Sequence, residues 1–219
     1  MSSFSDPKAI SSYAENATRR VPGLNDIHRM SALLLAESTS PNGRVLVLGA
    51  GGGMELNFFA QSFPGWQLDG VDPSSEMLSL ARDTLGPLAS RVQLHNGYIE
   101  AAPNGPFDAA CCLLTLHFTT EVERLRTLRE IHKRLKPGGV FVAVHYSISQ
   151  DHVERGLWLS RCAAFAILSG VDPEQATTAA AAIATQLPIL SPEQDEEIMR
   201  NAGFSDISTF YVGLAFRGW

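Results

Sequence analysis

Short apolar runs alternate with amphipathic segments over most of the chain. Uninterrupted apolar runs are typical of strands buried on both faces, whereas apolar positions three and four apart indicate helices. The expected strands are residues 44–48, 66–71, 92–94, 107–114 and 140–144. The expected helices are residues 24–38, 54–63, 74–85 and 121–135, the last stopped by Lys136-Pro137-Gly138-Gly139. This alternation predicts a doubly wound α/β fold, a mostly parallel sheet with helices on both faces.

The segment 151–187 breaks the alternation after the fifth strand. It reads as two helical stretches, about 152–169 and 173–186, and we interpret it as a helical cap over the ligand-binding end of the sheet. A further helix begins at Ser191-Pro192-Glu193, and two strands at about 206–211 and 213–217 bring the sheet to seven. We therefore expect a single domain with four parts: an N-terminal helical arm (1–38), a ligand-binding core (44–147), the cap (151–187) and a C-terminal helix with strands (191–219).

Composition narrows the class of protein. Of the 219 residues, 45% are hydrophobic and 18% charged, which is enough apolar material for a core and excludes a mostly disordered chain. The net charge of −6 makes nucleic acid an improbable partner, because that binding rests on Lys and Arg contacts to phosphates. No apolar stretch has the roughly 18 residues of a membrane span. The three cysteines have no metal-ligand spacing, so we expect no metal and a cytoplasmic location.

A glycine-rich loop between the first strand and its helix is the main chemical signal. Gly49-Ala50-Gly51-Gly52-Gly53 lets the backbone turn sharply and approach a ligand closely. Met54 stands where a dinucleotide-binding loop has its third glycine, which favours a ligand without a pyrophosphate. Asp72, at the end of the next strand, is the acid expected to accept hydrogen bonds from ribose hydroxyls. Alternatively, the loop is only a tight turn and Asp72 only caps the next helix.

Five successive motifs resemble those of class I S-adenosylmethionine-dependent methyltransferases. They are VLVLGAGGG at 45–53, GVDPSSEML at 70–78, NGYIE at 96–100, FD at 107–108 through LH at 116–117, and LKPGG at 135–139. The resemblance covers about residues 20–145 together with the Ala202-Gly203-Phe204 step. It implies a Rossmann-like methyltransferase fold and S-adenosyl-L-methionine as the cofactor.

The resemblance also implies which residues hold that cofactor. Gly49, Gly51 and Gly53 would line its methionine and ribose portion, and Asp72 would bind the ribose hydroxyls. Tyr98 and Ile99 would lie at the adenine edge, Leu113 near the sulfonium, and Pro73 beside Asp72. The remaining implied cofactor residues are Ala50, Met77 and, on the N-terminal arm, Arg19.

Two positions depart from the family pattern. Val47 stands where the family often has an acid that helps to hold the methionine amino group. Tyr98 stands where many members have an Asp that contacts the adenine amine. Binding would then depend more on backbone groups.

A narrower resemblance is to carboxy-S-adenosylmethionine synthases, which use prephenate and a modified cofactor. It rests on the RRVPGL motif at 19–24, TLHF at 115–118, and AGF at 202–204 with Phe210-Tyr211. Those enzymes carry an arginine in the helical insert that pairs with the extra carboxylate. The matching position falls near Ala182, and no Arg or Lys occurs between Arg161 and Arg200. A carboxylate without a charged partner loses about 1.5–3 kcal/mol of binding, so we rank ordinary methyl transfer first.

Transfer of a methyl group needs alignment of donor and acceptor, and a general base only if the acceptor loses a proton. His117 and His145 are the candidates for that base, the alternatives being a histidine packed beside the cofactor and a solvent-facing loop histidine. Further candidates are Tyr146 for the base, Tyr13 for the arm, and Phe4, Trp158, Phe165 and the stretch 216–219 for the acceptor pocket.

We expect a small-molecule acceptor. An Ala-rich helix in the cap leaves open the pairing of two copies as a homodimer. A catalytically silent cofactor-binding scaffold is a third hypothesis.

Overall fold

The computed structural model describes residues 13–219, and its contacts divide the chain into two compact units. The first unit includes Asp26–Leu113 and Glu130–Ala143; the second consists of Glu15–Asn25, Leu114–Arg129 and Val144–Trp219. Phe4 lies outside the described residues, as do the first twelve residues of the expected arm.

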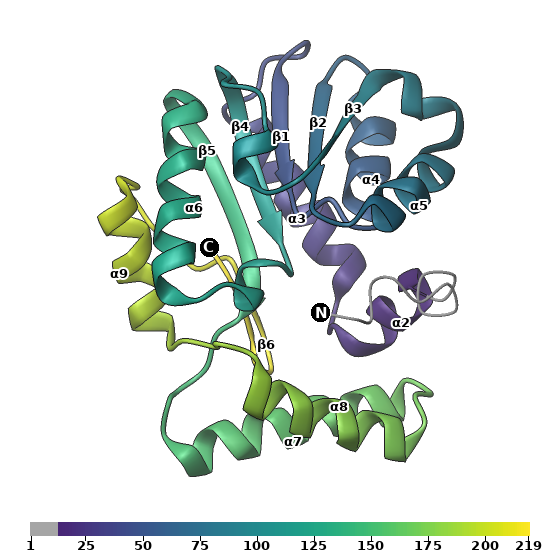
Figure 1. Ribbon diagram of the computed structural model, residues 1–219, viewed down its shortest axis with the longest axis vertical. Coiled ribbons are helices and arrows are strands. Elements are labelled where there is room, and N and C mark those ends of the chain that lie inside the picture. Colours follow the sequence, from purple (N-terminus) through teal and green to yellow (C-terminus); the bar gives the residue numbers. More distant parts are fainter. Residues whose placement is uncertain (1–12) are drawn as a thin grey trace. The chain divides into compact units, whose positions relative to one another are not determined.

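The first unit contains the alternating part of the fold (Figure 1). Its strands are β1 (Arg44–Leu48), β2 (Gln67–Asp72), β3 (Val92–Asn96) and β4 (Phe107–Leu113). Its helices are α3 (Leu24–Ala36), α4 (Met54–Ser62) and α5 (Ser75–Leu85), with short 3-10 turns at Gly86–Arg91 and Ile99–Ala101. Each expected strand and helix of this region is present within a few residues. The reason is the apolar pattern: all seven residues of β4 are buried, as are four of the five in β1.

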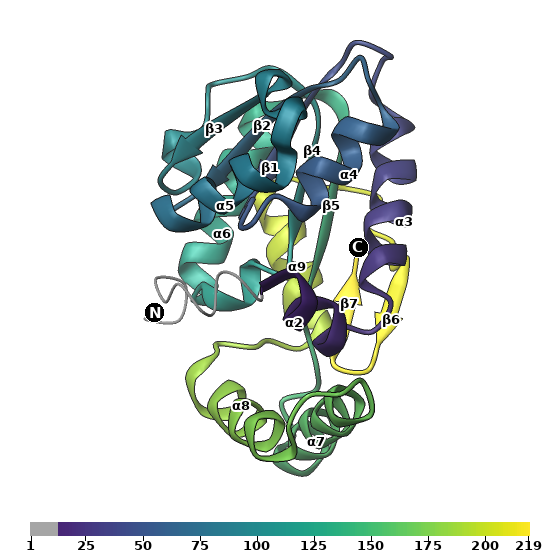
Figure 2. The same ribbon diagram turned by 90° about the vertical axis from the view of Figure 1, so that its right-hand side faces the viewer.

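The second unit contains most of the C-terminal third of the chain. Its helices are α2 (Tyr13–Arg20), α7 (His152–Leu168), α8 (Pro173–Gln186) and α9 (Pro192–Ala202), and its strands are β6 (Tyr211–Gly213) and β7 (Phe216–Gly218). A 3-10 turn covers Leu116–Phe118. Helices α7 and α8 lie side by side, as Figure 2 shows, and form the two helices expected after the fifth strand. Helix α6 (Glu121–Arg134) and strand β5 (Leu135–Tyr146) are divided between the two units.

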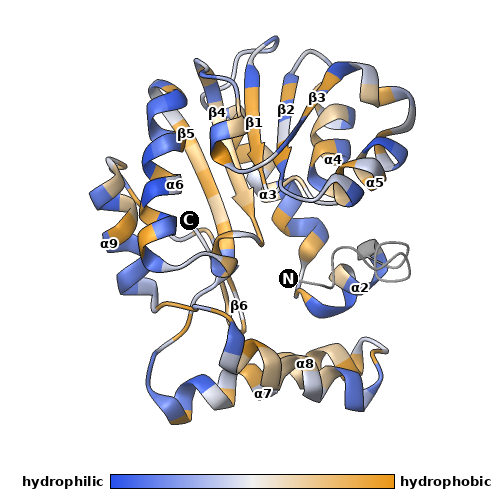
Figure 3. Cartoon of the chain, viewed as in Figure 1, coloured by the Kyte–Doolittle hydropathy of each residue, from blue (hydrophilic) through white to orange (hydrophobic). Residues whose placement is uncertain are grey.

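The strands form one sheet of seven with the order β3-β2-β1-β4-β5-β7-β6. The β1–β2, β1–β4 and β2–β3 pairs are parallel, whereas β7 pairs antiparallel with both β5 and β6. This is the mostly parallel seven-stranded sheet that the sequence predicted. Strands β1 and β4 are apolar along most of their length, while the outer faces of α6 and α9 are hydrophilic (Figure 3).

Three strand predictions were wrong in extent. The fifth strand begins at Leu135, so residues 136–139 extend the sheet instead of separating it from α6. Gly138 takes a left-handed backbone at φ 78°, and a Cβ on Gly139 would lie 2.8 Å from the Asp108 carbonyl oxygen. These glycines let the chain turn and approach its neighbour without leaving the sheet. The last two strands have three residues each, because Leu214 turns the chain at φ 55°.

Candidate functional site

The loop between β1 and α4 is a turn that only glycine adopts without strain. Gly49, Gly51 and Gly53 all have positive φ, of 75°, 45° and 80°. The backbone N–H groups of Gly49 and Ala50 donate to the Val71 carbonyl, at 2.8 and 3.0 Å, which ties the loop to the end of β2. A Cβ on Gly53 would lie 2.9 Å from the Ala81 Cα, so the loop also packs closely on α5.

Asp72 lies at the end of β2 and connects that strand to the glycine loop. Its Oδ2 accepts from the Gly51 N–H at 2.9 Å, and its Oδ1 accepts from the Ser74 N–H at 2.9 Å. Burial raises the pKa of this carboxyl, and the two backbone hydrogen bonds oppose the rise. A carboxylate offers about four acceptor positions, so Asp72 keeps capacity for ligand hydroxyls. Ser74, and not Asp72, caps α5 by accepting from the Met77 N–H at 3.1 Å.

Glu55 is an acidic residue of the site that the sequence analysis missed. It is the second residue of α4, and only 7% of its surface is exposed. Burial, with a smaller contribution from the nearby charge of Asp72, raises the pKa of Glu55 to about 8. The signal that was available is an acid two positions after the last glycine of the loop.

The other proposed cofactor residues of the first unit differ in exposure. Ala50, Met77, Ile99 and Leu113 are buried, and Pro73 is exposed. Tyr98 is 64% exposed, so its ring lies on the surface next to the buried Ile99. The apolar side chains therefore belong to the wall of the unit, and Tyr98 is the residue among them that is free to move.

His117 lies in the second unit and is almost completely buried. Its Nδ1 accepts a long hydrogen bond, 3.4 Å, from the Tyr146 N–H. Burial lowers the pKa of His117 well below its usual value, and neighbouring His145 and Arg124 lower it further. The imidazole is therefore neutral. Because Nδ1 accepts, its proton belongs on Nε2, where it is a donor.

His145 belongs to a buried group of charges and is not the loop histidine considered above. It lies inside β5 with no exposed surface, and its Nε2 is 3.2 Å from Oδ2 of Asp195, without hydrogen-bond geometry. Asp195 on α9 also forms an ion pair with Arg124 of α6, and all three side chains are buried. Although burial would raise the pKa of Asp195, His145 and Arg124 hold it below its usual value. These surroundings favour a structural role for His145.

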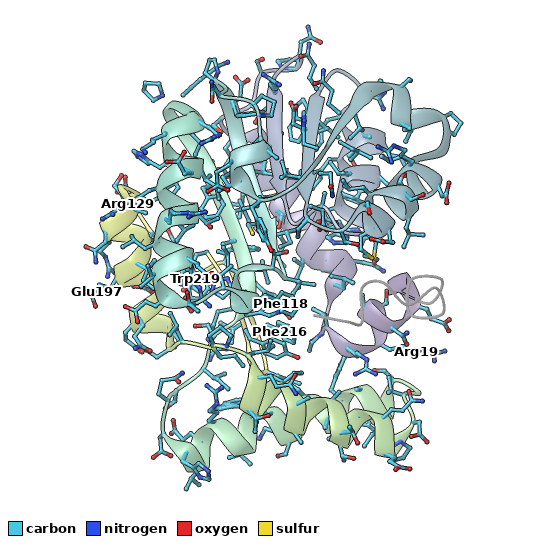
Figure 4. All side chains as sticks on the ribbon, in the orientation of Figure 1. Arg19, Phe118, Arg129, Glu197, Phe216 and Trp219 are labelled. Atoms are coloured by element: carbon cyan, nitrogen blue, oxygen red, sulfur yellow. The ribbon has the colours of Figure 1, made fainter. Side chains whose placement is uncertain are left out.

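Aromatic rings cover the two histidines within the second unit. The Trp219 ring lies 5.1 Å from His145, and the Phe216 ring lies 4.1 Å from Tyr146; Figure 4 labels both aromatic residues. Phe216 and Trp219 therefore pack in the interior around β5. Arg217 of the same stretch, together with Trp158, lines a pocket of about 610 Å³ in the second unit.

Arg19 of α2 forms an exposed ion pair with Glu15 at 2.5 Å. Trp158 on α7 has the Arg161 guanidinium over its ring, 4.4 Å from the ring centre, and the side chain of Tyr13 is not among those described. Residues 13–219 contain no group of three metal-binding side chains, and the three cysteines are buried thiols without a disulfide. None of the helices in that range is long and apolar enough to cross a membrane.

Comparison with known proteins identifies the family of this fold. Residues 45–139, which include the glycine loop and Asp72, match a family described as "Methyltransferase domain". Residues 45–139 are therefore a methyltransferase domain, and its motifs are those of the class I S-adenosylmethionine-dependent enzymes. Its cofactor is accordingly S-adenosyl-L-methionine, as the resemblance of its motifs implied.

Relatives of the methyltransferase include proteins that resemble almost the whole chain. A carboxy-S-adenosyl-L-methionine synthase of Campylobacter fetus is 23% identical over 96% of the chain and 90% of that protein. An uncharacterised methyltransferase of Synechocystis is 33% identical over 65% of the chain and 64% of that protein. Phosphoethanolamine N-methyltransferase 2 of Haemonchus contortus, solved with S-adenosyl-L-methionine, has a TM-score of 0.66 at 22% identity. That match covers 92% of the chain but only 42% of the larger solved chain, and it shows the shared fold.

Proposed function

We propose that the protein transfers a methyl group from S-adenosyl-L-methionine to a small-molecule acceptor, with the cofactor held by the loop 49–53 and Asp72. The hydrogen bond between the Asp72 carboxylate and the Gly51 N–H carries the proposal. It holds an acid that can accept from ribose hydroxyls against a loop with no side chains in a ligand's way. The Asp72 carboxylate and the glycine backbone beside it therefore fit a nucleoside-like cofactor.

The other proposed cofactor contacts follow from which side chains are buried and which are exposed. Met77, Ile99 and Leu113 supply buried apolar surface, and Pro73 and the exposed Tyr98 ring are the groups able to cover an adenine. Arg19 is held by Glu15, so any role in covering the cofactor requires that exposed pair to open. Exposed pairs contribute only about 0.2–1 kcal/mol, so its opening is inexpensive.

When bound, the cofactor supplies an electrophilic methyl group. The chain then has to align the acceptor and exclude water, because an in-line displacement needs little further chemistry. His117, neutral with its proton on Nε2, suits a hydrogen-bond donor that positions an acceptor oxygen or nitrogen. It does not suit a general base in this tautomer, and the complete burial of His145 against Asp195 argues against that role there as well.

Carboxy-S-adenosylmethionine synthesis is the second candidate, because curated relatives with that name cover 96% of the chain. The structure adds an observation on α8. A pocket of about 540 Å³ beside Ala179 and Ala182 is lined by one cation, Arg20, and by the acids Asp172 and Glu174. Acids outnumber the cation there, which disfavours an added carboxylate. We therefore place ordinary methyl transfer first.

Three measurements test the proposed function. Mass spectrometry of the nucleoside that copurifies distinguishes S-adenosylmethionine or S-adenosylhomocysteine from the carboxylated cofactor, with and without added prephenate. Calorimetry with S-adenosylhomocysteine and with NADH tests the cofactor class. Tighter binding of NADH would refute the cofactor assignment, and a carboxylated product from prephenate would promote the second candidate. Methylated product from a panel of small acceptors separates an enzyme from a silent scaffold.

A further inference from the structure

Glu55 is a buried carboxyl beside the glycine loop with no cation to balance it. It is more than nine-tenths buried, yet within residues 13–219 no Lys, Arg or His forms an ion pair with it. The hydrogen bond to its carboxyl comes from its own backbone N–H, at the beginning of α4. Burying a charge without a partner is strongly unfavourable, so such a group calls for a ligand or a proton.

The sheet register locates the part of the site that Glu55 reaches. Val47 of β1 is the register partner of Gly70 on one side and of Cys111 on the other, so these three residues share one face of the sheet. A Cβ on Gly70 would lie 2.7 Å from Leu56 Cδ1, which shows that α4 covers this face. Burial raises the pKa of the Cys111 thiol well above its usual value, and the charge of Glu55 raises it further. Glu55 therefore lies close to the strand position occupied by Val47.

Val47 is one of the two departures noted in the sequence. It is completely buried and apolar, and it stands where related methyltransferases often have an acid. The carboxyl of Glu55 comes to the same region from the helix that covers the strand. A carboxyl group is thus present on this side of the loop, although the strand does not provide it.

We infer that Glu55 binds the α-ammonium group of the cofactor's methionine portion, taking the place of an acid at position 47. The inference rests on the proposed cofactor site and names the group that one of its walls recognises. An ammonium beside Glu55 and Asp72 would give both carboxyls the cation that the protein lacks there. The ligand would thereby offset the like-charge repulsion that arises when Glu55 ionises beside Asp72.

This arrangement couples binding to the loss of a proton. With a pKa of about 8, Glu55 is mostly protonated at pH 7 in the free protein, and pairing with an ammonium requires the carboxylate. The Glu55 proton then passes to the buffer, and the carboxylate keeps the electron pair. The titratable groups facing Glu55 are Asp72 at the end of β2 and the Cys111 thiol on β4. Asp72 also has a raised pKa, so the glutamine variant is needed to separate the two acids.

The experiment compares two ligands that differ in the amino-acid portion. S-Adenosylhomocysteine carries the α-ammonium, whereas 5′-methylthioadenosine keeps the adenine and ribose but has no amino acid. Calorimetry with both is done on the wild type, Glu55→Gln and the control Glu37→Gln, which removes one exposed acid of the same unit. Titrations at pH 6.5 and 8, in two buffers of different ionisation enthalpy, count the protons released.

We expect Glu55→Gln to weaken S-adenosylhomocysteine binding about tenfold or more at pH 8, the loss of a charge-assisted contact. Methylthioadenosine affinity should change less than about twofold, and Glu37→Gln should bind both ligands like the wild type. Wild-type binding of S-adenosylhomocysteine at pH 6.5 should release nearly one proton more than binding to Glu55→Gln.

Three results would overturn the inference. They are an unchanged affinity of Glu55→Gln for S-adenosylhomocysteine, an equal loss for both ligands, or equal proton release from the two proteins. If neither ligand binds the wild type, the proposed cofactor site itself is refuted. If methylthioadenosine binds normally and the ammonium makes no difference, only the role of Glu55 falls. The wild-type proton count keeps the test decisive even if the variant folds poorly.

Discussion

The Oδ2 atom of Asp72 accepts a hydrogen bond of 2.9 Å from the backbone N–H of Gly51. This bond joins the end of β2 to the loop after β1, so one carboxylate both shapes the loop and faces the proposed ligand. Two residues that are 21 positions apart in the chain thereby act as one binding element.

Asp72→Ala should weaken S-adenosylhomocysteine binding by about 1.5–3 kcal/mol, through the loss of hydrogen bonds to a charged acceptor. Calorimetry at pH 8 measures this, with Glu37→Gln as the control for the change in net charge. Equal affinity of Asp72→Ala and the wild type would remove Asp72 from the ribose-binding role.

Gly53→Ala should destabilise the fold more than Gly86→Ala. Both glycines have positive φ, of 80° and 52°, so each alanine is strained by roughly 1–3 kcal/mol. Only at Gly53 would the new Cβ also meet backbone, 2.9 Å from the Ala81 Cα, since nothing lies within 4 Å at Gly86. Urea denaturation measures the free energy of unfolding of both variants. Equal losses would show that α5 yields to the loop without cost.

Asp195→Asn should lower the free energy of unfolding by about 3–5 kcal/mol, because it leaves Arg124 buried without its counter-charge. The matched control is Glu196→Gln on the same helix, where the ion pair with Arg200 is solvent-exposed. That change should have an effect below about 1 kcal/mol. Similar effects of the two substitutions would mean that the buried pair adds nothing beyond an exposed one.

His28 should make the protein less stable as the pH falls below 6.5. Burial lowers the pKa of His28 to about 4. Between pH 6.5 and 4 the unfolded chain therefore binds a proton at this residue that the folded protein does not, and the free energy of unfolding falls with the pH. The loss between pH 7 and pH 5 should be about 2 kcal/mol.

Urea denaturation of the wild type, His28→Leu and His28→Gln across this pH range measures the free energy of unfolding. His28→Leu and His28→Gln should lack this part of the slope, while the exposed control His152→Gln should keep it. Glu55 acts with the opposite sign, since its raised pKa takes stability away as the pH rises from about 4.5 to 8. The test therefore compares the pH dependence of the free energy of unfolding between each variant and the wild type. If both His28 variants keep the wild-type slope, the prediction for His28 is refuted.

We propose that α7 and α8 form a cap that opens locally and controls acceptor entry. The buried residues between these two helices are small, namely Ala163, Ala166, Val171 and Ala176. Small side chains bury little apolar area, so local opening should require less free energy than global unfolding.

Hydrogen exchange should therefore be faster over residues 152–186 than in the strands at 44–48 and 140–144. It should slow when cofactor and acceptor are both bound. Protection of α7 and α8 equal to that of the central strands, and unchanged by ligands, would establish a static layer instead.

The alternation of strands and helices was predictable because it is determined by residues that are close together in the sequence. A buried parallel strand such as 44–48 is a continuous apolar run, and helix ends carry their own signals. Ser191 forms the expected cap of α9, with Gln194 completing a capping box, and Gly203 ends that helix in a left-handed conformation. The boundaries of α7 and α8 were predicted within about one residue for the same reason.

The late strands were less predictable because their pairing is not local. Gly138 and Gly139 read as a stop, yet the backbone of the neighbouring β4 accommodates them within a strand. Similarly, β6 and β7 depend on the position of Leu214 at the turn and on the partner β5.

At the site, the sequence by itself determined the glycine loop and the acid that follows the next strand, because both lie at fixed positions in the strand–helix alternation. Only the tertiary structure decided what surrounds each titratable side chain. It buried His145 against Asp195, left Nδ1 of His117 as an acceptor, and brought Glu55 to the face of Val47 and Cys111. The physical reason is that burial and pairing across the sheet set the charge of a side chain, and both depend on residues far away in the chain.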